Sequence, residues 1–154
     1  TPGHTAGHVS LFRDEDAVLI AGDAVATVDM DSWTALTLEL PAVTRPAAPF
    51  TTDWETAHES VRVILSLQPS VLAAGHGVPV FGPGVEPALR ALVTDFPLPR
   101  RGRYRAQPAV TDTTGVVAVP PAVHDPYPTI FLGAALGALG SMLVLRRRKK
   151  HWWS

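Results

Sequence analysis

Apolar and polar residues follow distinct patterns in the first part of the chain, and each pattern predicts one structural element. Residues 9–13 alternate between apolar and polar, as a half-buried strand does, whereas residues 17–21 are continuously apolar, as a fully buried strand is. The acidic residues 14–16 between them fit a turn, so the two stretches predict a β-hairpin. A further apolar run, residues 70–74, predicts another short strand.

Two longer stretches carry apolar residues at helical spacing. The first follows Thr52-Asp-Trp-Glu55, a capping box in which Thr52 is expected to be the N-cap and Glu55 stands three residues later. The second stretch is residues 85–96. Between the hairpin and the first helix, residues 24–51 have weak periodicity and several prolines, which predicts an irregular crossover. The domain is therefore expected to span residues 1–97.

The character of the chain changes twice after residue 97. Residues 98–127 are rich in Pro, Arg and Thr and predict an extended linker. Residues 128–145 carry no charge and predict one transmembrane helix, because about 18 helical residues span roughly 27 Å, close to the hydrocarbon thickness of a bilayer. A buried core helix is the alternative, but this segment is apolar all round and runs into the basic tail, residues 146–154.

The lipid bilayer is therefore an expected partner, and the chain is expected to be a single-pass membrane protein. The positive-inside rule places the basic tail in the cytoplasm and the soluble part outside it. Small residues recur every four positions at Gly133, Gly137 and Ser141, a spacing that permits close helix–helix packing and predicts a homodimer. Small residues are also common in membrane helices in general, which is the simpler explanation of the same spacing.

Composition excludes several classes of function. The net charge is −1 at pH 7, so no overall positive field recruits nucleic acid. The chain has no cysteine, which excludes disulfides, zinc ribbons and thiolate chemistry. Because the chain opens with Thr1 in the middle of a motif, we expect it to be a truncated piece of a longer protein.

Three short segments each combine a potential metal ligand with glycine at the end of a predicted strand. They are Thr-Pro-Gly-His-Thr-Ala-Gly-His (residues 1–8), Ala-Gly-Asp (residues 21–23) and Ala-Gly-His-Gly (residues 74–77). Glycine lets the backbone turn sharply and approach an ion. Two imidazoles and a carboxylate suit zinc, and also iron or manganese. A single Gly-Asp pair is usually a turn, and a single His is usually a surface residue, but the three segments together indicate a metal site.

In this order the segments resemble the last three ligand motifs of the metallo-β-lactamase superfamily, especially its glyoxalase-II-like hydrolases, over about residues 1–97. The resemblance implies an α/β fold of the α+β type, namely the C-terminal half of an αββα sandwich. It implies that His4 is a ligand of a first metal, His76 a ligand of a second, and Asp23 the carboxylate that bridges both. His8 is outside that ligand set, and either it supports a ligand from behind or it simply packs.

The resemblance also implies a metal-dependent hydrolase with two zinc ions that acts on a small-molecule substrate. Such ions lower the pKa of a bound water towards about 7, and the hydroxide attacks an ester, thioester, amide or phosphodiester. The family's upstream motif, His-x-His-x-Asp-His, does not occur in this sequence. Two alternatives therefore stay open: a catalytically inactive, membrane-anchored remnant, and an iron-dependent oxidising member of the same fold.

We expect residues 1–127, expressed alone, to retain less than one tightly bound zinc per chain and to show no hydrolysis above background. The reason is that the motifs present supply only part of the ligand set that the resemblance implies. Metal analysis after dialysis measures this directly. Recovery of two zinc ions per chain would contradict the expectation.

Overall fold

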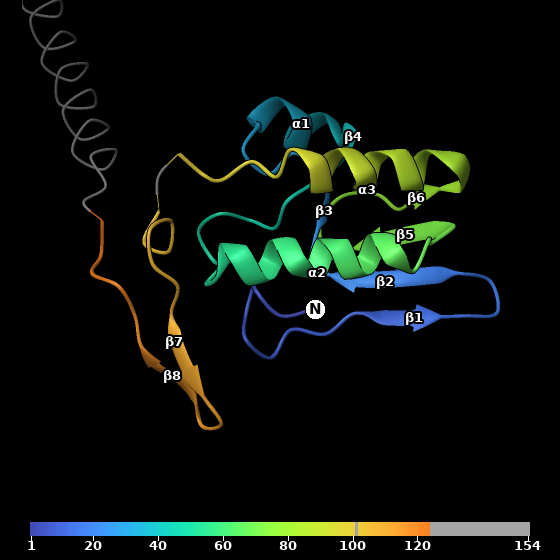
Figure 1. The fold of residues 1–154 in the computed structure, drawn as a ribbon. Helices are drawn as coiled ribbons and strands as arrows, with labels where there is room; N and C mark the ends of the chain where they lie inside the picture. The colour runs from blue at the N-terminus through green and yellow to red at the C-terminus, as the bar shows by residue number, and fades with distance from the viewer. Residues whose placement is uncertain (101, 124–154) are drawn as a thin grey trace, which may run out of the picture. The chain divides into compact units, whose positions relative to one another are not determined.

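A computed structural model of the chain describes residues 1–100 and 102–123 (Figure 1). The chain divides into two units, Thr1–Pro121 and Ala122–Ser154, and the elements below belong to the first. Its helices are α1 (Trp33–Leu38), α2 (Trp54–Ser66), the 3-10 turn η1 (Gly82–Gly84) and α3 (Val85–Thr94). Its strands are β1 (Leu11–Arg13), β2 (Val18–Gly22), β3 (Ala26–Val28), β4 (Pro41–Thr44), β5 (Val71–Ala74), β6 (Val80–Phe81), β7 (Val110–Asp112) and β8 (Gly115–Ala118).

The main sheet has four strands in the order β1-β2-β5-β6. Strands β1 and β2 form the antiparallel hairpin that the sequence predicts, with Leu11 opposite Ile20. Strand β5 pairs parallel with β2, and β6 runs antiparallel to β5. Parallel neighbours need a crossover connection, and here α2 supplies it. The predicted hairpin and the predicted later strand are both confirmed.

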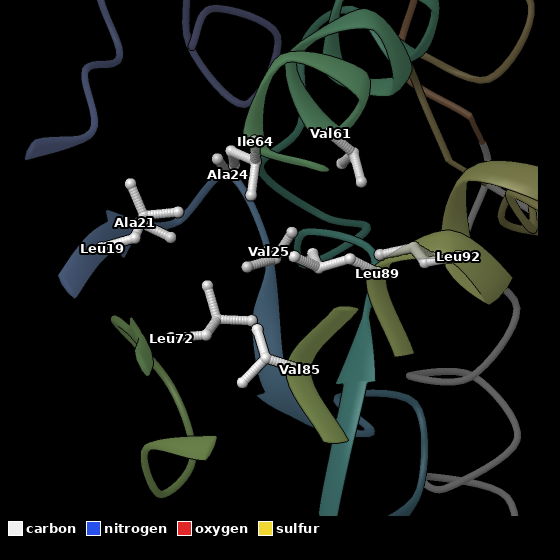
Figure 2. Close-up of a cluster of buried hydrophobic side chains, with 10 residues drawn as sticks. All are labelled: Leu19, Ala21, Ala24, Val25, Val61, Ile64, Leu72, Val85, Leu89 and Leu92. Carbon is white, nitrogen blue, oxygen red and sulfur yellow. The ribbon is translucent and has the colours of Figure 1, made fainter. Parts of the chain in front are cut away.

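The hydrophobic core lies between the sheet and helices α2 and α3, which run side by side in Figure 1. Figure 2 shows ten of its side chains, from β2 and the turn after it, α2, β5 and α3. They are Leu19, Ala21, Ala24, Val25, Val61, Ile64, Leu72, Val85, Leu89 and Leu92. Apolar burial of this kind is the main contribution to the stability of a small domain.

One face of the sheet stays exposed, which corrects the prediction that residues 17–21 form a fully buried strand. Leu19 and Ala21 are completely buried, but Ile20 between them is 54% exposed. Leu11 and Phe81 share that face by strand register and are 65% and 66% exposed. A continuous apolar run therefore coincides here with a strand that buries a single face.

The first helix begins one residue later than the capping box predicts, so the assignment of Thr52 as N-cap is wrong. The N-cap is Asp53, whose Oδ1 accepts the backbone N–H groups of Glu55 and Thr56, both at 3.1 Å. The Thr52 hydroxyl instead lies 3.3 and 3.2 Å from the carbonyl oxygens of Gly3 and His4, to which it donates. Asp caps a helix about as well as Thr does, so the sequence alone does not separate the two residues.

The segment predicted as an irregular crossover, residues 24–51, contains regular elements. Strands β3 and β4 form a small antiparallel sheet, and α1 stands between them. Arg45 follows β4 and is 7% exposed; its guanidinium pairs with the Asp31 carboxylate and lies 5.2 Å from the centre of the Trp54 ring. Arg45 also donates to the Pro46 carbonyl at 3.0 Å. These contacts hold α1 and its flanking turns against the domain.

The predicted extended linker, residues 98–127, contains the antiparallel hairpin of β7 and β8. The N–H of Ala109 donates to the Thr52 carbonyl at 2.9 Å, which ties the start of this hairpin to the segment before α2. Within residues 1–100 and 102–123, no helix combines the length and the apolar character needed to cross a bilayer. The predicted transmembrane segment 128–145 and the basic tail 146–154 lie outside the described residues.

Replacing the observed cap, Asp53→Ala, should lower the free energy of unfolding by about 1 kcal/mol, because two backbone donors of α2 lose their acceptor. Urea unfolding followed by tryptophan fluorescence measures this, since Trp54 lies at the start of α2. Asp14→Ala, in an exposed turn, serves as the control and should change stability by less than about 0.5 kcal/mol. Equal effects of the two substitutions would exclude Asp53 as the cap.

Candidate metal centre

His4 lies in a loop that rests on the first turn of α2. The carbonyl oxygen of Gly3 accepts the backbone N–H groups of Thr52 and Asp53, at 3.2 and 3.0 Å. Gly3 has a φ of 129°, and a Cβ at this position would overlap the backbone of Ala57. A glycine is therefore required for this close approach, which fixes His4 relative to α2.

Asp23 follows β2, and His8 holds its backbone. The N–H of Asp23 donates to Nε2 of His8 at 2.9 Å, and Nδ1 of His8 lies 3.0 Å from the carbonyl oxygen of Thr1. An imidazole that accepts at Nε2 and donates at Nδ1 is neutral and has one defined tautomer. Because both ring nitrogens contact backbone, His8 lies behind Asp23 and holds the loop that carries it.

His76 follows β5, and the buried side chain of Thr27 holds its backbone. The carbonyl oxygen of His76 accepts the N–H and the hydroxyl of Thr27, at 2.9 and 3.0 Å, and Thr27 is completely buried. Gly77 has a φ of 90°, and a Cβ there would lie 2.6 Å from the Thr27 backbone. The N–H of Gly75 donates to the Gly22 carbonyl at 2.8 Å, so the loops after β2 and β5 lie side by side.

The structure brings His4, Asp23 and His76 together. Nε2 of His4 lies 3.7 Å from Oδ2 of Asp23, and Nε2 of His76 lies 3.7 Å from Oδ1. The side chains are 12%, 36% and 50% exposed, respectively, so the cluster opens to solvent on the His76 side. Gly75 lies so close that a Cβ there would overlap Oδ1 of Asp23. The carboxylate thus faces one imidazole with each of its oxygens.

The hydrogen bonds of His4 indicate that its Nε2 carries a lone pair. Thr51 donates its hydroxyl hydrogen to the Ala47 carbonyl at 2.8 Å, so it can only accept from Nδ1 of His4, 3.1 Å away. Burial lowers the pKa of His4 below its usual value of 6.5, although the nearby Asp23 carboxylate acts to raise it. At neutral pH two acceptors, Nε2 of His4 and Oδ2 of Asp23, therefore face each other, and a cation between them would satisfy both.

The donor atoms of the cluster are arranged as two pairs that share the Asp23 carboxylate. Among residues 1–100 and 102–123, no group of three His, Cys, Asp or Glu side chains surrounds a common point suitable for a metal. Instead, each oxygen of Asp23 forms a half-site with one imidazole nitrogen. Nitrogen and oxygen donors suit zinc, iron and manganese. A zinc site usually has four ligands, so each half-site requires further ligands.

Sequence patterns do not reveal the residues that hold these side chains. Thr51, Thr52 and Thr27 each position one of the two histidines through a hydroxyl group. A lone threonine in an irregular segment carries no motif, and the capping-box pattern assigns Thr52 to the helix end instead. His58 on α2 is partly buried away from the cluster, with Nε2 2.8 Å from the Val93 carbonyl.

Residues 1–76 match the family described as the Metallo-beta-lactamase superfamily. The chain is 48% identical over 82 residues to the probable metallo-hydrolase YflN of Bacillus subtilis (strain 168), a stretch that is 53% of this chain and 31% of that protein. The chain therefore spans about a third of the length of this curated relative.

Two solved structures are also similar. One is the archaeal metallo-beta-lactamase superfamily protein ST1585 from Sulfolobus tokodaii, with a TM-score of 0.45, 24% identity, and coverage of 66% of this chain and 32% of that one. The other is the metallo-beta-lactamase family protein TTHA1429 from Thermus thermophilus, with a TM-score of 0.42, 28% identity, and coverage of 62% and 28%.

We expect the imidazole of His4 to titrate below pH 6.5 in the metal-free chain, because burial opposes its protonation. Asp23→Asn should lower this pKa further, since it removes the negative charge that favours the protonated ring. NMR titration of the histidine ring protons measures both pKa values. Asp16→Asn, which removes the partner of exposed Arg13 and not a neighbour of His4, is the matched control. A higher pKa of His4 in Asp23→Asn would contradict the expectation.

The lowered pKa of His4 also determines how the free energy of unfolding depends on pH. The unfolded chain protonates His4 near pH 6.5, whereas the folded chain does so at lower pH, so folding is disfavoured progressively as pH falls through this window. Well above pH 6.5 the ring is neutral in both the folded and the unfolded chain, and the effect on stability vanishes.

Proposed function

We propose that the complete protein is a metal-dependent hydrolase of the metallo-β-lactamase superfamily, the family that residues 1–76 match, and that its metal ligands include His4, Asp23 and His76. The observation that carries this proposal is the position of the Asp23 carboxylate, which presents one oxygen to each imidazole at 3.7 Å. The 48% identity to a probable metallo-hydrolase supports the same class of reaction.

In this proposal His4 would hold a first ion, His76 would hold a second, and Asp23 would contribute one carboxylate oxygen to each. Bound divalent ions supply Lewis acidity and a water molecule whose pKa is lowered towards about 7. The negative charge of Asp23 offsets the repulsion between two cations. Thr51 holds the His4 ring with Nε2 directed at Asp23, and Thr27 holds the His76 backbone beside it.

His8 is proposed as a positioning residue and not as a ligand. Its Nε2 is already occupied by the N–H of Asp23, and its Nδ1 lies against the carbonyl oxygen of Thr1. A residue that orients a ligand in this way typically affects metal affinity about 10–100-fold. Loss of His8 should therefore weaken metal binding without removing a donor atom.

The finer features of the proposal rest on the sequence pattern. We assign zinc as the metal, with iron or manganese as ions that the same donors accept. Residues 128–145 are proposed as a single membrane anchor with a cytoplasmic tail, and the face of Gly133, Gly137 and Ser141 as a dimer contact. The substrate is proposed to be a small molecule.

The test uses the protein produced from its complete gene, with metal analysis and a panel of ester, thioester, amide and phosphodiester substrates. Asp23→Asn should abolish both metal binding and hydrolysis, and His8→Ala should lower metal affinity about 10–100-fold. His58→Gln is the matched control, because His58 contacts Val93 and not the cluster, and it should keep its metal.

Retention of metal and activity by Asp23→Asn would refute the proposal. Bound iron together with oxygen uptake would instead identify an oxidising member of the fold. A protein that binds no metal would be the inactive remnant.

A further inference from the structure

A small cavity of about 170 Å³ lies beside His76. Its walls come from the end of β3, the turn after it, α1 and the loop after β5. The lining residues are Val28, Met30, Leu36, Glu39, His76, Gly77 and Val78. We call this cavity the Met30 pocket. Because His76 is one of its walls, the pocket adjoins the proposed metal centre directly.

The chemistry of the pocket is apolar with a single negative charge. Aliphatic or thioether side chains come from Val28, Met30, Leu36 and Val78. The polar side chains of the lining belong to His76 and Glu39, and Glu39 supplies the negative charge. A volume of 170 Å³ corresponds to about six water-sized groups, since each occupies about 30 Å³. The pocket thus fits a short apolar chain, and the Glu39 carboxylate disfavours an anion.

The wall that carries Met30 is anchored from behind. Buried Arg45 pairs with Asp31, the residue next to Met30, and stacks over Trp54. The N–H of Asp31 also donates to Oδ1 of Asp29 at 2.9 Å. A buried guanidinium with these partners cannot move without losing several contacts at once, so the turn is held in place.

The opposite wall is fixed by the end of α1. Glu39 adopts a left-handed conformation, with φ 49° and ψ 42°, and its N–H bonds to the Ala35 carbonyl. The N–H of Leu40 donates to the same carbonyl at 3.0 Å. Both walls are therefore held by the protein's own contacts, as in ligand sites that are largely pre-formed.

We propose that the Met30 pocket binds an uncharged apolar substituent, of up to about six heavy atoms, on a substrate whose reacting group lies at His76 and Asp23. This inference rests on the proposed function, which it narrows to substrates with a short aliphatic group, such as an ester with a short acyl chain. A phosphodiester polymer would place negative charge beside Glu39 and is disfavoured.

The first test measures binding without metal or catalysis. The chain has two methionines, Met30 and Met142, so methyl-labelled methionine gives one NMR probe inside the pocket. In the full chain, 1-hexanol should shift the Met30 methyl signal saturably, and hexanoate should shift it at concentrations at least several-fold higher. Glu39→Gln removes the negative charge and should reduce the difference between the concentrations of 1-hexanol and hexanoate that shift the signal. The Met142 signal reports separately on uptake by residues 128–145.

A matched pair of variants separates the pocket from the surface of α1. Leu36→Trp fills the pocket, whereas Leu38→Trp places the same side chain at a 63% exposed position on the same helix. Leu36→Trp should abolish the saturable shift at Met30, and Leu38→Trp should preserve it. An unshifted Met30 methyl, or an equal response in both variants, would overturn the proposal.

The second test connects the pocket to catalysis in the complete protein. Leu36→Trp should lower kcat/KM for a hexanoyl ester relative to an acetyl ester by about tenfold or more, and Leu38→Trp should leave this ratio unchanged. An unchanged ratio in Leu36→Trp would overturn the assignment to the substrate. If the Met30 methyl responds but the protein binds no metal and hydrolyses nothing, the proposed function fails while the pocket itself is supported.

Discussion

The parallel pairing of β2 with β5 is the constraint on which the candidate centre depends. Parallel strands end at the same edge of a sheet, so the turns that carry Asp23 and His76 lie next to each other, joined by the hydrogen bond from Gly75 to Gly22. The crossover that makes the pairing possible contains α2, and the first turn of α2 receives the loop of His4. One crossover unit thereby gathers three side chains that are far apart in the sequence.

This arrangement couples the spacing of the cluster to the packing of the core. Asp23 and His76 are attached to the sheet, whereas His4 is attached to α2 through Gly3. The separation of the His4 ring from the carboxylate therefore depends on how closely α2 packs on β2 and β5. Buried residues such as Ile64 and Leu72 set that distance. Because protein interiors are close-packed, adding or removing one methylene group in this layer changes the distance between the His4 ring and the Asp23 carboxylate.

Local patterns predicted the elements whose signal is contained within one stretch of chain. The hairpin, β5 and the two longer helices follow from periodicity, and the three histidine and aspartate segments follow from their motifs. The misassigned cap has a non-local cause: Thr52 and Asp53 are both good caps, and the contact of Thr52 with Gly3 and His4 decides between them. The elements of residues 24–51 were missed because each is too short for a period to be read. The bridging role expected of Asp23 comes from the family resemblance alone, and neither spacing nor composition predicts its 3.7 Å contacts with His4 and His76.

The hydrogen bond from Thr27 to His76 makes the Thr27 amide a probe of the opening of the loop after β5. The amide of Thr27 is completely buried and donates to the carbonyl oxygen of His76, so its proton can reach solvent only when the loop after β5 lifts away from β3. Hydrogen exchange at this single amide therefore counts the openings of the His76 loop, on a timescale of minutes to hours that ring titrations do not sample. A ligand that holds the loop closed would slow that exchange without touching Thr27 itself.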